Sequence, residues 1–321
     1  MISLVVPFYN EAAAIEQFVA ALLPVLDSMS ELKFEIVCVD DGSRDDTLDK
    51  LCALAQADPR FRVIEFSRNF GKEAALTAGI NEALGDAVIP IDADLQDPPS
   101  LIPALIEEWV KGAEVVLARR KDRSTDSFLK RRSATLFYRL HNRLADLQIP
   151  ENVGDFRLMD RLVIDALKRL PERQRFMKGL FAWVGFRTTF LDYVREPRVA
   201  GRTKFSGWRL WNFALEGFTS FSTLPLKTWT YVGALGAVAT LCYAAFIVVR
   251  TIERGIDVPG YASLLVAVLF LGSLQLLSIG VLGEYVGRIY MEAKQRPTYV
   301  IRKTYTHGGR LDSSRAAADQ R

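Results

Sequence analysis

Two long apolar runs in the C-terminal half of the sequence limit the possible folds of this chain more than any other feature. Neither Trp229–Val249 nor Ala262–Gly283 contains a charged residue. At a helical rise of about 1.5 Å per residue, each run is long enough to cross the hydrocarbon core of a membrane. The alternative, that they are core helices of a larger soluble protein, is disfavoured by this lack of charge. With the short polar link between them, the two runs predict a transmembrane helical hairpin.

The residues around the hairpin indicate how it lies in a membrane. Basic residues are frequent on its two outer sides, whereas the two arginines of the link are offset by two acidic residues. Because positive charge favours the cytoplasmic side, both ends of the hairpin are expected there. Residues 206–227 mix Trp and Phe with polar side chains, which predicts amphipathic helices in the membrane interface. One hairpin is a small anchor, which favours a homo-oligomer.

The first 120 residues alternate short β-branched runs with helical patterns, which is typical of an α/β domain with a parallel-rich sheet and helices on both faces. Asn10 is expected to cap the first helix, and Ser43 and Asp46 have the spacing of a capping box for the second. The expected strands are Ile2–Val6, Phe34–Val39, Arg62–Phe66, Ala87–Ile91 and Glu114–Ala118, with an edge strand at Arg187–Val194.

The pattern divides the chain into four parts. We expect an α/β domain at 1–205, interfacial helices at 206–227, and two transmembrane helices within 228–284, at about 229–249 and 262–283. The last part, 285–321, is a C-terminal segment that ends in a disordered polar tail after about Thr306.

Polar clusters follow four of the expected strands, at the point where each strand ends. Because the carboxyl ends of parallel strands meet at one edge of a sheet, where open α/β sheets bind ligands, these clusters predict one site. The clusters are Pro7-Phe8-Tyr9-Asn10-Glu11, Asp40-Asp41-Gly42-Ser43, Asn69-Phe70-Gly71-Lys72 and Asp92-Ala93-Asp94-Leu95-Gln96-Asp97-Pro98.

The acidic residues in these clusters point to a nucleotide and a metal. Asp92 and Asp94 lie one residue apart after a strand, so both could reach a divalent cation that bridges two phosphates. Asp40 and Asp41 suit hydrogen bonds to a base edge and a ribose hydroxyl, although a role in forming the turn is an alternative. No Gly-x-Gly-x-x-Gly or P-loop motif is present. A net charge of +3 gives no reason to expect a nucleic acid partner.

These four clusters together resemble the motif series of the family 2 inverting glycosyltransferases with the GT-A fold. The string Asp92-Ala93-Asp94-Leu95-Gln96 is a more specific signature of this family than Asp-x-Asp alone. The polyprenyl-phosphate glycosyltransferases, which include dolichyl-phosphate mannose synthase and the bactoprenol (undecaprenyl-phosphate) glucosyltransferases, are the most similar subset. The resemblance runs from residue 1 to about 300, and the segments 181–186 and 211–231 are most similar to the bactoprenol branch.

The resemblance implies roles for individual residues. Asp94 and Asp155 would be catalytic, with Asp155 orienting or activating the acceptor. Asp92, Asp94 and Gln96 would hold Mg²⁺ or Mn²⁺. The family's basic motif usually has Ser before its Lys, whereas this chain has Arg202-Thr203-Lys204, a departure that keeps a hydroxyl. Nucleotide-sugar binding is implied for Pro7, Tyr9, Asn10, Glu11, Asp40, Asp41, Lys72, Asp92, Ala93, Asp94 and Gln96, and phosphate or acceptor binding for Arg119, Arg132, Arg202 and Lys204.

The implied activity is transfer of a hexose, with glucose from UDP-glucose preferred, onto undecaprenyl or another polyprenyl phosphate. Mannose, galactose, an N-acetylhexosamine and an aminoarabinose derivative stay open as the sugar. The protein would be a multi-pass protein of the inner (cytoplasmic) membrane with its catalytic domain facing the cytoplasm. One alternative is a processive polysaccharide synthase, which normally has a Gln-x-x-Arg-Trp string that this chain lacks. The other is a non-catalytic membrane scaffold of the same fold.

Overall fold

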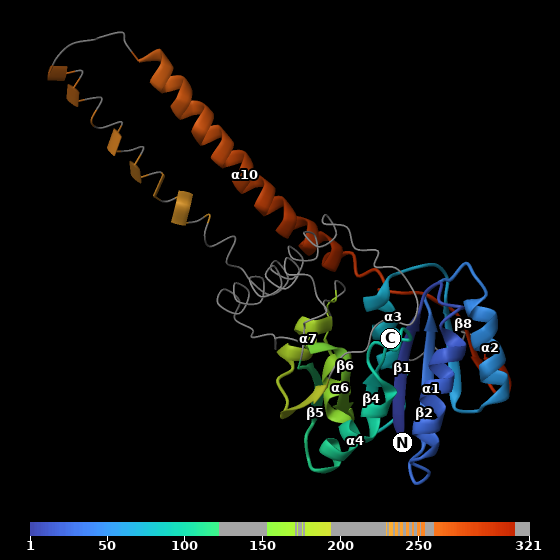
Figure 1. The fold of residues 1–321 in the computed structure, drawn as a ribbon. Coiled ribbons are helices and arrows are strands. Elements are labelled where there is room, and N and C mark those ends of the chain that lie inside the picture. Colours follow the sequence, from blue (N-terminus) through green and yellow to red (C-terminus); the bar gives the residue numbers. More distant parts are fainter. Residues whose placement is uncertain are drawn as a thin grey trace.

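The computed structural model describes residues 1–121, 153–170, 172, 175, 177–193 and 260–311, and scattered positions from 229 to 253. Nine strands within these residues form one sheet in the order β7-β5-β6-β4-β1-β2-β3-β8-β9. Figure 1 shows this sheet with helices on both of its faces and one long helix running away from it. The strands are β1 (Ile2–Phe8), β2 (Phe34–Asp40), β3 (Phe61–Phe66), β4 (Ala87–Pro90), β5 (Val115–Arg120), β6 (Val153–Asp160), β7 (Thr188–Tyr193), β8 (Ile301–Thr306) and β9 (Gly309–Leu311).

The centre of the sheet is parallel, as the sequence predicts. β1 pairs in parallel with β2 and β4, and β2 pairs in parallel with β3. β7 pairs with β5 and lies at the edge, which confirms the edge strand expected near Arg187–Val194. β6 is a strand that the sequence did not predict, and it runs antiparallel between β4 and β5. The parallel-rich α/β fold class is therefore confirmed.

Two hydrophobic cores cover the two faces of the sheet. Because side chains alternate along a strand, Leu4, Val6 and Phe8 of β1 enter one core and Val5 enters the other. The first core packs against α1 (Ile15–Asp27), α2 (Thr47–Ala57) and α4 (Ile102–Val110), which follows the short 3₁₀ turn η1 (Pro99–Leu101). The second core packs against α3 (Lys72–Glu82), α6 (Arg161–Lys168) and α7 (Met177–Trp183).

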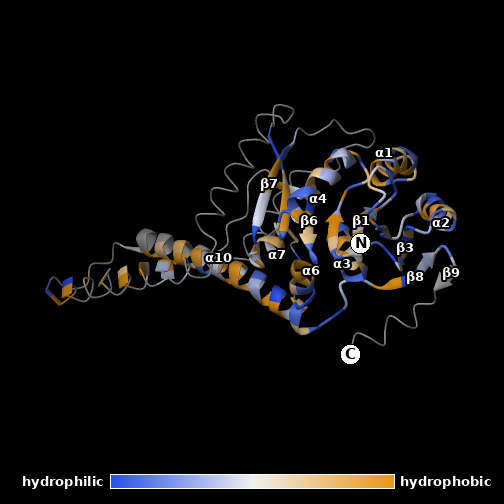
Figure 2. Ribbon diagram, turned by 90° about the horizontal axis from the view of Figure 1, so that it is seen from below, coloured by the Kyte–Doolittle hydropathy of each residue, from blue (hydrophilic) through white to orange (hydrophobic). Residues whose placement is uncertain are grey.

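The long helix α10 (Tyr261–Ala293) contains the second predicted transmembrane run. Within the described part of the chain, Phe270–Ala293 is the one helical stretch long and apolar enough to cross a membrane, and none of its apolar window is buried. Figure 2 shows hydrophobic residues along much of α10. Only scattered positions of the first run are described, and each of these between 229 and 253 is helical.

The chain returns from α10 to the sheet, which the sequence did not predict. β8 pairs antiparallel with β3, and β9 pairs antiparallel with β8. The prediction of a disordered tail after Thr306 is therefore wrong for Gly309–Leu311, which form β9. The nearly buried Glu65 of β3 accepts hydrogen bonds from Arg302 Nη1 (2.9 Å) and from the Tyr305 hydroxyl (2.8 Å). These bonds explain why two short polar strands stay on the sheet.

Removal of the Tyr305 hydroxyl tests this attachment. We expect Tyr305→Phe to lower the free energy of unfolding by about 1–3 kcal/mol, because a buried carboxylate loses a hydrogen-bond donor. Urea unfolding of the full chain in detergent measures the change. Tyr9→Phe is the matched control, since the Tyr9 side chain is exposed and makes no hydrogen bond within the described residues. If both variants are as stable as the parent chain, the bond from Tyr305 does not hold β8 in place.

Candidate functional site

Asp92, just after β4, and Asp155, on β6, lie at the same edge of the sheet. The predicted role of Asp92 is metal binding and that of Asp155 is catalytic. β4 and β6 pair Ala87 with Asp160 and Val88 with Met159. Continued along both chains, this antiparallel register places Asp155 opposite Asp92. Asp155 comes near the start of β6 and Asp92 just after β4, so both lie where the carboxyl ends of the parallel strands meet. The register therefore brings together two residues that are 63 positions apart in the sequence.

Lys72 joins these two aspartates. Its Nζ atom lies 2.7 Å from Asp92 Oδ2 and 2.8 Å from Asp155 Oδ2. The Lys72 side chain is 45% exposed and the Asp155 side chain 18%. Burial by itself would lower the pKa of Lys72, but the negative charges of Asp92 and Asp155 outweigh it and raise that pKa above its ordinary value. The three groups form a half-buried charged cluster, which we call the Lys72 cluster.

The loop after β4 is fixed by polar contacts at both of its ends. Asp94 Oδ1 accepts a hydrogen bond from the Gln96 backbone N–H (3.2 Å), and the residue between them, Leu95, has a φ of 57°. Asp97 is buried and accepts a hydrogen bond from the Tyr193 hydroxyl. Burial and the nearby charge of Asp97 raise the pKa of Tyr193 to about 12. Ala93 packs in the first core, so its side chain does not face the edge.

The loops after β1 and β2 are bound to each other, and this overturns two predicted helix caps. The Asn10 backbone N–H donates to Ser43 Oγ (3.0 Å), and Asn10 Oδ1 accepts from the Arg44 backbone N–H (2.8 Å). The Glu11 backbone N–H donates to Thr47 Oγ1 (2.9 Å). Helix α1 begins at Ile15 without a side-chain cap, and α2 likewise has none at Asp46. Asn10 and Ser43 link the two loops, because their short polar side chains can hydrogen-bond to the backbone of a neighbouring segment as well as to their own.

Asp40 and Asp41 are both buried, but they have different partners. Asp41 is 3% exposed and accepts hydrogen bonds from the backbone N–H groups of Phe70 (2.6 Å) and Gly71 (2.9 Å). It therefore fixes the loop that leads to Lys72. Asp40 is 1% exposed, and its Oδ1 atom has no hydrogen-bond partner among the described residues. Burial is the largest cause that raises the pKa of each carboxyl above its ordinary value.

The remaining predicted residues at this edge differ in what they contact. Pro7 lies in β1 with an intermediate exposure, and the Tyr9 side chain is 39% exposed just after that strand. Arg119 forms an ion pair with Asp192 of the neighbouring strand β7, at 2.6 Å. Arg120, the next residue, donates to the Tyr193 hydroxyl and lies 4.0 Å from Asp97. Arg132, Arg202 and Lys204, and the interfacial segment 206–227, lie outside the described residues.

The chemistry of the Asp92 and Asp94 side chains fits a divalent cation that is also bound by a substrate. Asp92 Oδ2 already holds one cationic group, the Lys72 ammonium. In the part of the chain that the structure describes, no three His, Cys, Asp or Glu side chains form a group that could hold a metal alone. Mg²⁺ and Mn²⁺ prefer oxygen ligands, and Mg²⁺ usually binds one or two carboxylates together with substrate phosphates. A cation here would take its remaining ligands from water or from substrate phosphate oxygens.

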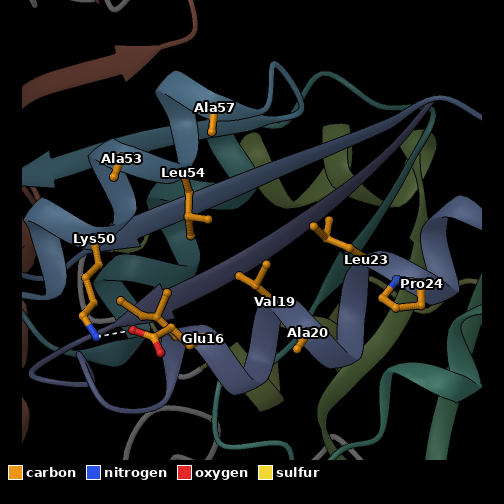
Figure 3. A pocket seen from close by; sticks show the side chains of 10 residues that line it. Glu16, Val19, Ala20, Leu23, Pro24, Lys50, Ala53, Leu54 and Ala57 are labelled. Atoms are coloured by element: carbon orange, nitrogen blue, oxygen red, sulfur yellow. Dashed lines mark hydrogen bonds and ion pairs between the residues drawn. The ribbon is translucent and has the colours of Figure 1, made fainter.

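A groove between α1 and α2 lies apart from these residues (Figure 3). It has a volume of about 640 Å³ and an apolar lining that includes Val19, Leu23 and Leu54. The ion pair between Lys50 and Glu16, at 2.7 Å, is its main polar feature. The groove contains none of the predicted site residues, so the candidate site is the polar edge of the sheet.

The buried charge of Asp40 predicts a pH-dependent gain in stability when it is removed. Because the folded pKa of Asp40 is raised above 3.8, its charged form destabilises the fold once the pH exceeds the raised value. We expect Asp40→Asn to increase the free energy of unfolding by about 1–3 kcal/mol at pH 8. The gain should disappear as the pH falls toward the ordinary value, where the carboxyl is protonated in both states. Urea unfolding at several pH values measures it.

Asp45→Asn is the contrasting control. Although burial works in the other direction, hydrogen bonds from Thr47 and Ala12 lower the pKa of Asp45, so its carboxylate stabilises the fold at neutral pH. This variant should be less stable than the parent chain at neutral pH, with the difference lost in acid. If Asp40→Asn also destabilises the protein at pH 8, the buried carboxylate of Asp40 is satisfied by a partner in the native state.

Comparison with known proteins identifies the family. Residues 3–168 match the model of glycosyl transferase family 2, and residues 224–289 match that of the GtrB C-terminal hairpin. A bactoprenol glucosyl transferase of Shigella phage SfII is 54% identical over 304 residues, which cover 95% of this chain and 98% of the relative. An uncharacterized glycosyltransferase of Synechocystis sp. is 53% identical over 300 residues, which cover 94% of each chain.

A solved structure is also similar, at lower identity. Glucosyl-3-phosphoglycerate synthase from Mycobacterium tuberculosis, in complex with Mn²⁺, UDP-glucose and phosphoglyceric acid, is 24% identical with a TM-score of 0.45. The match covers 68% of this chain and 77% of that one. The family model and the near full-length relatives agree with the motifs that follow β1, β2, β3 and β4: the chain belongs to glycosyl transferase family 2, and it is a glycosyltransferase with a GT-A-type fold.

Proposed function

We propose that this glycosyltransferase moves a hexose, with glucose from UDP-glucose as the first candidate, onto undecaprenyl phosphate or another polyprenyl phosphate. The observation that carries the proposal is the Lys72 cluster. It places the predicted donor-side carboxylate of Asp92 and the predicted acceptor-side carboxylate of Asp155 on one ammonium group. A site where both substrates meet is what a direct transfer between them requires.

The donor side is supported by Asp40 and by the relatives. A buried carboxylate oxygen without a partner among the described residues, at the edge where the strands end, suits the N–H of a uracil base. Relatives more than half identical over nearly the whole chain are named as glucosyl transferases. We therefore assign UDP-glucose to this edge, with Pro7, Tyr9, Asn10 and Glu11 beside the nucleotide. Mannose, galactose, N-acetylhexosamine or aminoarabinose donors are the alternatives that an assay distinguishes.

The acceptor side is supported by α10 and by the names of the same relatives. Those relatives are named for bactoprenol, which is a lipid acceptor. Several large apolar side chains of α10 are exposed, including Leu264, Phe270 and Leu276, and water does not favour such a surface. We infer that α10 and the run at 229–249 form a two-helix membrane anchor, with the catalytic domain on the cytoplasmic side. Arg119, Arg132, Arg202 and Lys204 would contact phosphates there, and several copies would assemble in the membrane.

The proposed reaction is a single in-line displacement with inversion at the anomeric carbon. An oxygen of the lipid phosphate is the nucleophile, and since phosphomonoesters have a second pKa of about 6 it is already anionic near neutral pH. No strong general base is then needed, so Asp155 would orient the acceptor. Asp92, Asp94 and Gln96 would hold Mg²⁺ or Mn²⁺, which when bound supplies positive charge to the leaving diphosphate.

An extraction assay tests the proposal directly. The purified full chain is mixed with undecaprenyl phosphate and one of several radiolabelled nucleotide-sugars, with Mg²⁺, Mn²⁺ or EDTA. We expect label to enter the organic phase from UDP-glucose, and only with a divalent cation. Transfer from a different donor would replace glucose as the sugar. No transfer from any donor, by protein that still binds UDP, would show that the acceptor is not a polyprenyl phosphate.

The metal-binding role of Asp94 has its own test. We expect Asp94→Ala to reduce turnover by about 100-fold or more, because charge on the leaving diphosphate is no longer neutralised by a held cation. Membrane association should be unchanged, and the free energy of unfolding should fall by no more than about 1 kcal/mol, for the lost hydrogen bond from the Gln96 N–H. Asp165→Ala, a half-exposed position on α6, is the control and should keep full activity. Turnover by Asp94→Ala close to that of the parent chain would exclude Asp94 as a metal ligand.

A further inference from the structure

Among the basic side chains that the structure describes, Lys72 is unusual because it contacts two carboxylates with different predicted roles. Within the described residues, the ion pair with Lys72 is the only one that Asp92 makes. Asp92 is the proposed ligand of the cation on the donor, and Asp155 is the residue proposed to orient the acceptor. Lys72 therefore occupies a place where a metal cation would act.

Charge shows why the arrangement cannot stay the same when the donor binds. Asp92 and Asp155 both lie against Lys72 Nζ, at 2.7 and 2.8 Å, and would repel each other without a cation between them. A divalent cation at Asp92 would compete with the Lys72 ammonium for the same carboxylate, and it would also repel that ammonium at close range. Binding of the cation and diphosphate would thus weaken the ion pair between Lys72 and Asp92.

The backbone around Lys72 is fixed, whereas its side chain has room to move. Gly71, directly before it, donates its N–H to Asp41. Glu73, directly after it, accepts a hydrogen bond from the Met177 backbone N–H (3.1 Å). The next residues of α3, from Ala74 to Ile80, are buried. The Lys72 side chain is half exposed, on a flexible four-carbon stem that can place its ammonium at several points around one Cα position.

We propose that Lys72 is a positioning residue that couples donor binding to acceptor binding. Before the donor binds, Lys72 holds Asp92 and Asp155 together. With a cation and diphosphate held at Asp92, the Lys72 ammonium would be released from that carboxylate and would remain beside Asp155, where it would attract the phosphate of the lipid acceptor. The inference rests on the proposed function and deepens it, because it assigns Lys72 to the acceptor side and not to the nucleotide-sugar pocket.

An order of binding follows from this arrangement. With Lys72 shared between two carboxylates, its charge is largely neutralised and attracts an acceptor phosphate weakly. Once the donor releases it from Asp92, it becomes a better partner for that phosphate. The donor should therefore strengthen acceptor binding, and by linkage the acceptor should strengthen donor binding by the same factor.

Mn²⁺ binding without nucleotide gives a test that does not depend on turnover. Free Mn²⁺ is measured by electron paramagnetic resonance with the full chain in detergent, as the parent, Lys72→Met, Lys72→Arg and Lys111→Met. We expect Lys72→Met to bind Mn²⁺ about tenfold more tightly than the parent, because one competing charge is removed. Lys72→Arg keeps that charge and should stay within about twofold of the parent. Lys111, paired with Glu107 and Glu108 on α4, is the matched control and should have no effect.

Steady-state kinetics give the second measurement. We expect Lys72→Met to raise KM for the polyprenyl phosphate about tenfold, while it binds UDP with Mn²⁺ at least as tightly as the parent does, because no ammonium competes for Asp92. Lys72→Arg should restore most of the acceptor affinity. If KM for the lipid is unchanged and UDP binding is weakened instead, Lys72 is a donor ligand and the inference is overturned. Equal Mn²⁺ affinity for Lys72→Met and the parent also overturns it.

Failure of this inference can be told apart from failure of the proposed function. If the parent chain transfers glucose and Lys72→Met leaves both Mn²⁺ affinity and lipid KM unchanged, the inference fails and the proposed function stands. If the parent chain transfers no sugar from any donor, the proposed function fails. In that case the Mn²⁺ titration still decides whether Lys72 competes with a cation for Asp92.

Discussion

The candidate site depends on the antiparallel entry of β6 into an otherwise parallel region of the sheet. A parallel strand between β4 and β5 would place its carboxyl end at the site edge, with Asp160 there and Asp155 toward the middle. Because β6 runs the other way, its first residues reach that edge and Asp155 lies opposite Asp92. Lys72 then needs only to reach from the start of α3 to contact both carboxylates. One reversal of strand direction thus sets the geometry of the cluster.

Sequence reasoning found most of the residues at this edge, since strand ends with polar clusters are a local signal. These clusters located Asp40, Lys72 and Asp92, whereas Asp155 was indicated only by the family resemblance. In the structure, Lys72 contacts both Asp92 and Asp155. Sequence reasoning missed β6, whose Gly154, Asp155 and Arg157 are poor strand formers without a clear alternation. This strand forms because β4 and β5 pair with it on both sides, which is a tertiary effect.

Two other differences have the same origin in contacts between distant segments. Asn10 and Ser43 have the composition of helix caps, but each bonds to the loop of the other and not to its own helix. β8 and β9 follow a membrane-length helix and contain charged and polar residues, so their sequence indicates a tail. The buried Glu65 of β3 provides the partner for Arg302 and Tyr305, and it is 237 positions from Arg302. Neither segment contains a sequence pattern that predicts its pairing with the other.

The buried carboxylates show that this edge is not arranged for stability alone. Burial raises the pKa of both Asp40 and Asp41, so the charged form of each is held by the fold at a cost in free energy. Two backbone N–H groups offset that cost for Asp41, and in return the loop before Lys72 is fixed. Asp40 has no such compensation at its Oδ1 atom within the described chain. A ligand that donates a hydrogen bond to this atom would offset part of the free-energy cost of burying the carboxylate. The buried Asp40 oxygen therefore favours binding of such a ligand.

The segment after α10 joins the membrane-length helix to the same part of the sheet. The Tyr299 ring stacks on Phe66 at 5.2 Å, and Phe66 meets the Phe70 ring edge-on at 5.7 Å. Phe70 donates its N–H to Asp41, two residues before Lys72. The chain that runs from α10 to β8 (Figure 1) is thus packed against the loop that leads to Lys72. Because an attachment at this edge limits how far the site can turn relative to α10, it favours a fixed orientation of the Lys72 cluster relative to that helix.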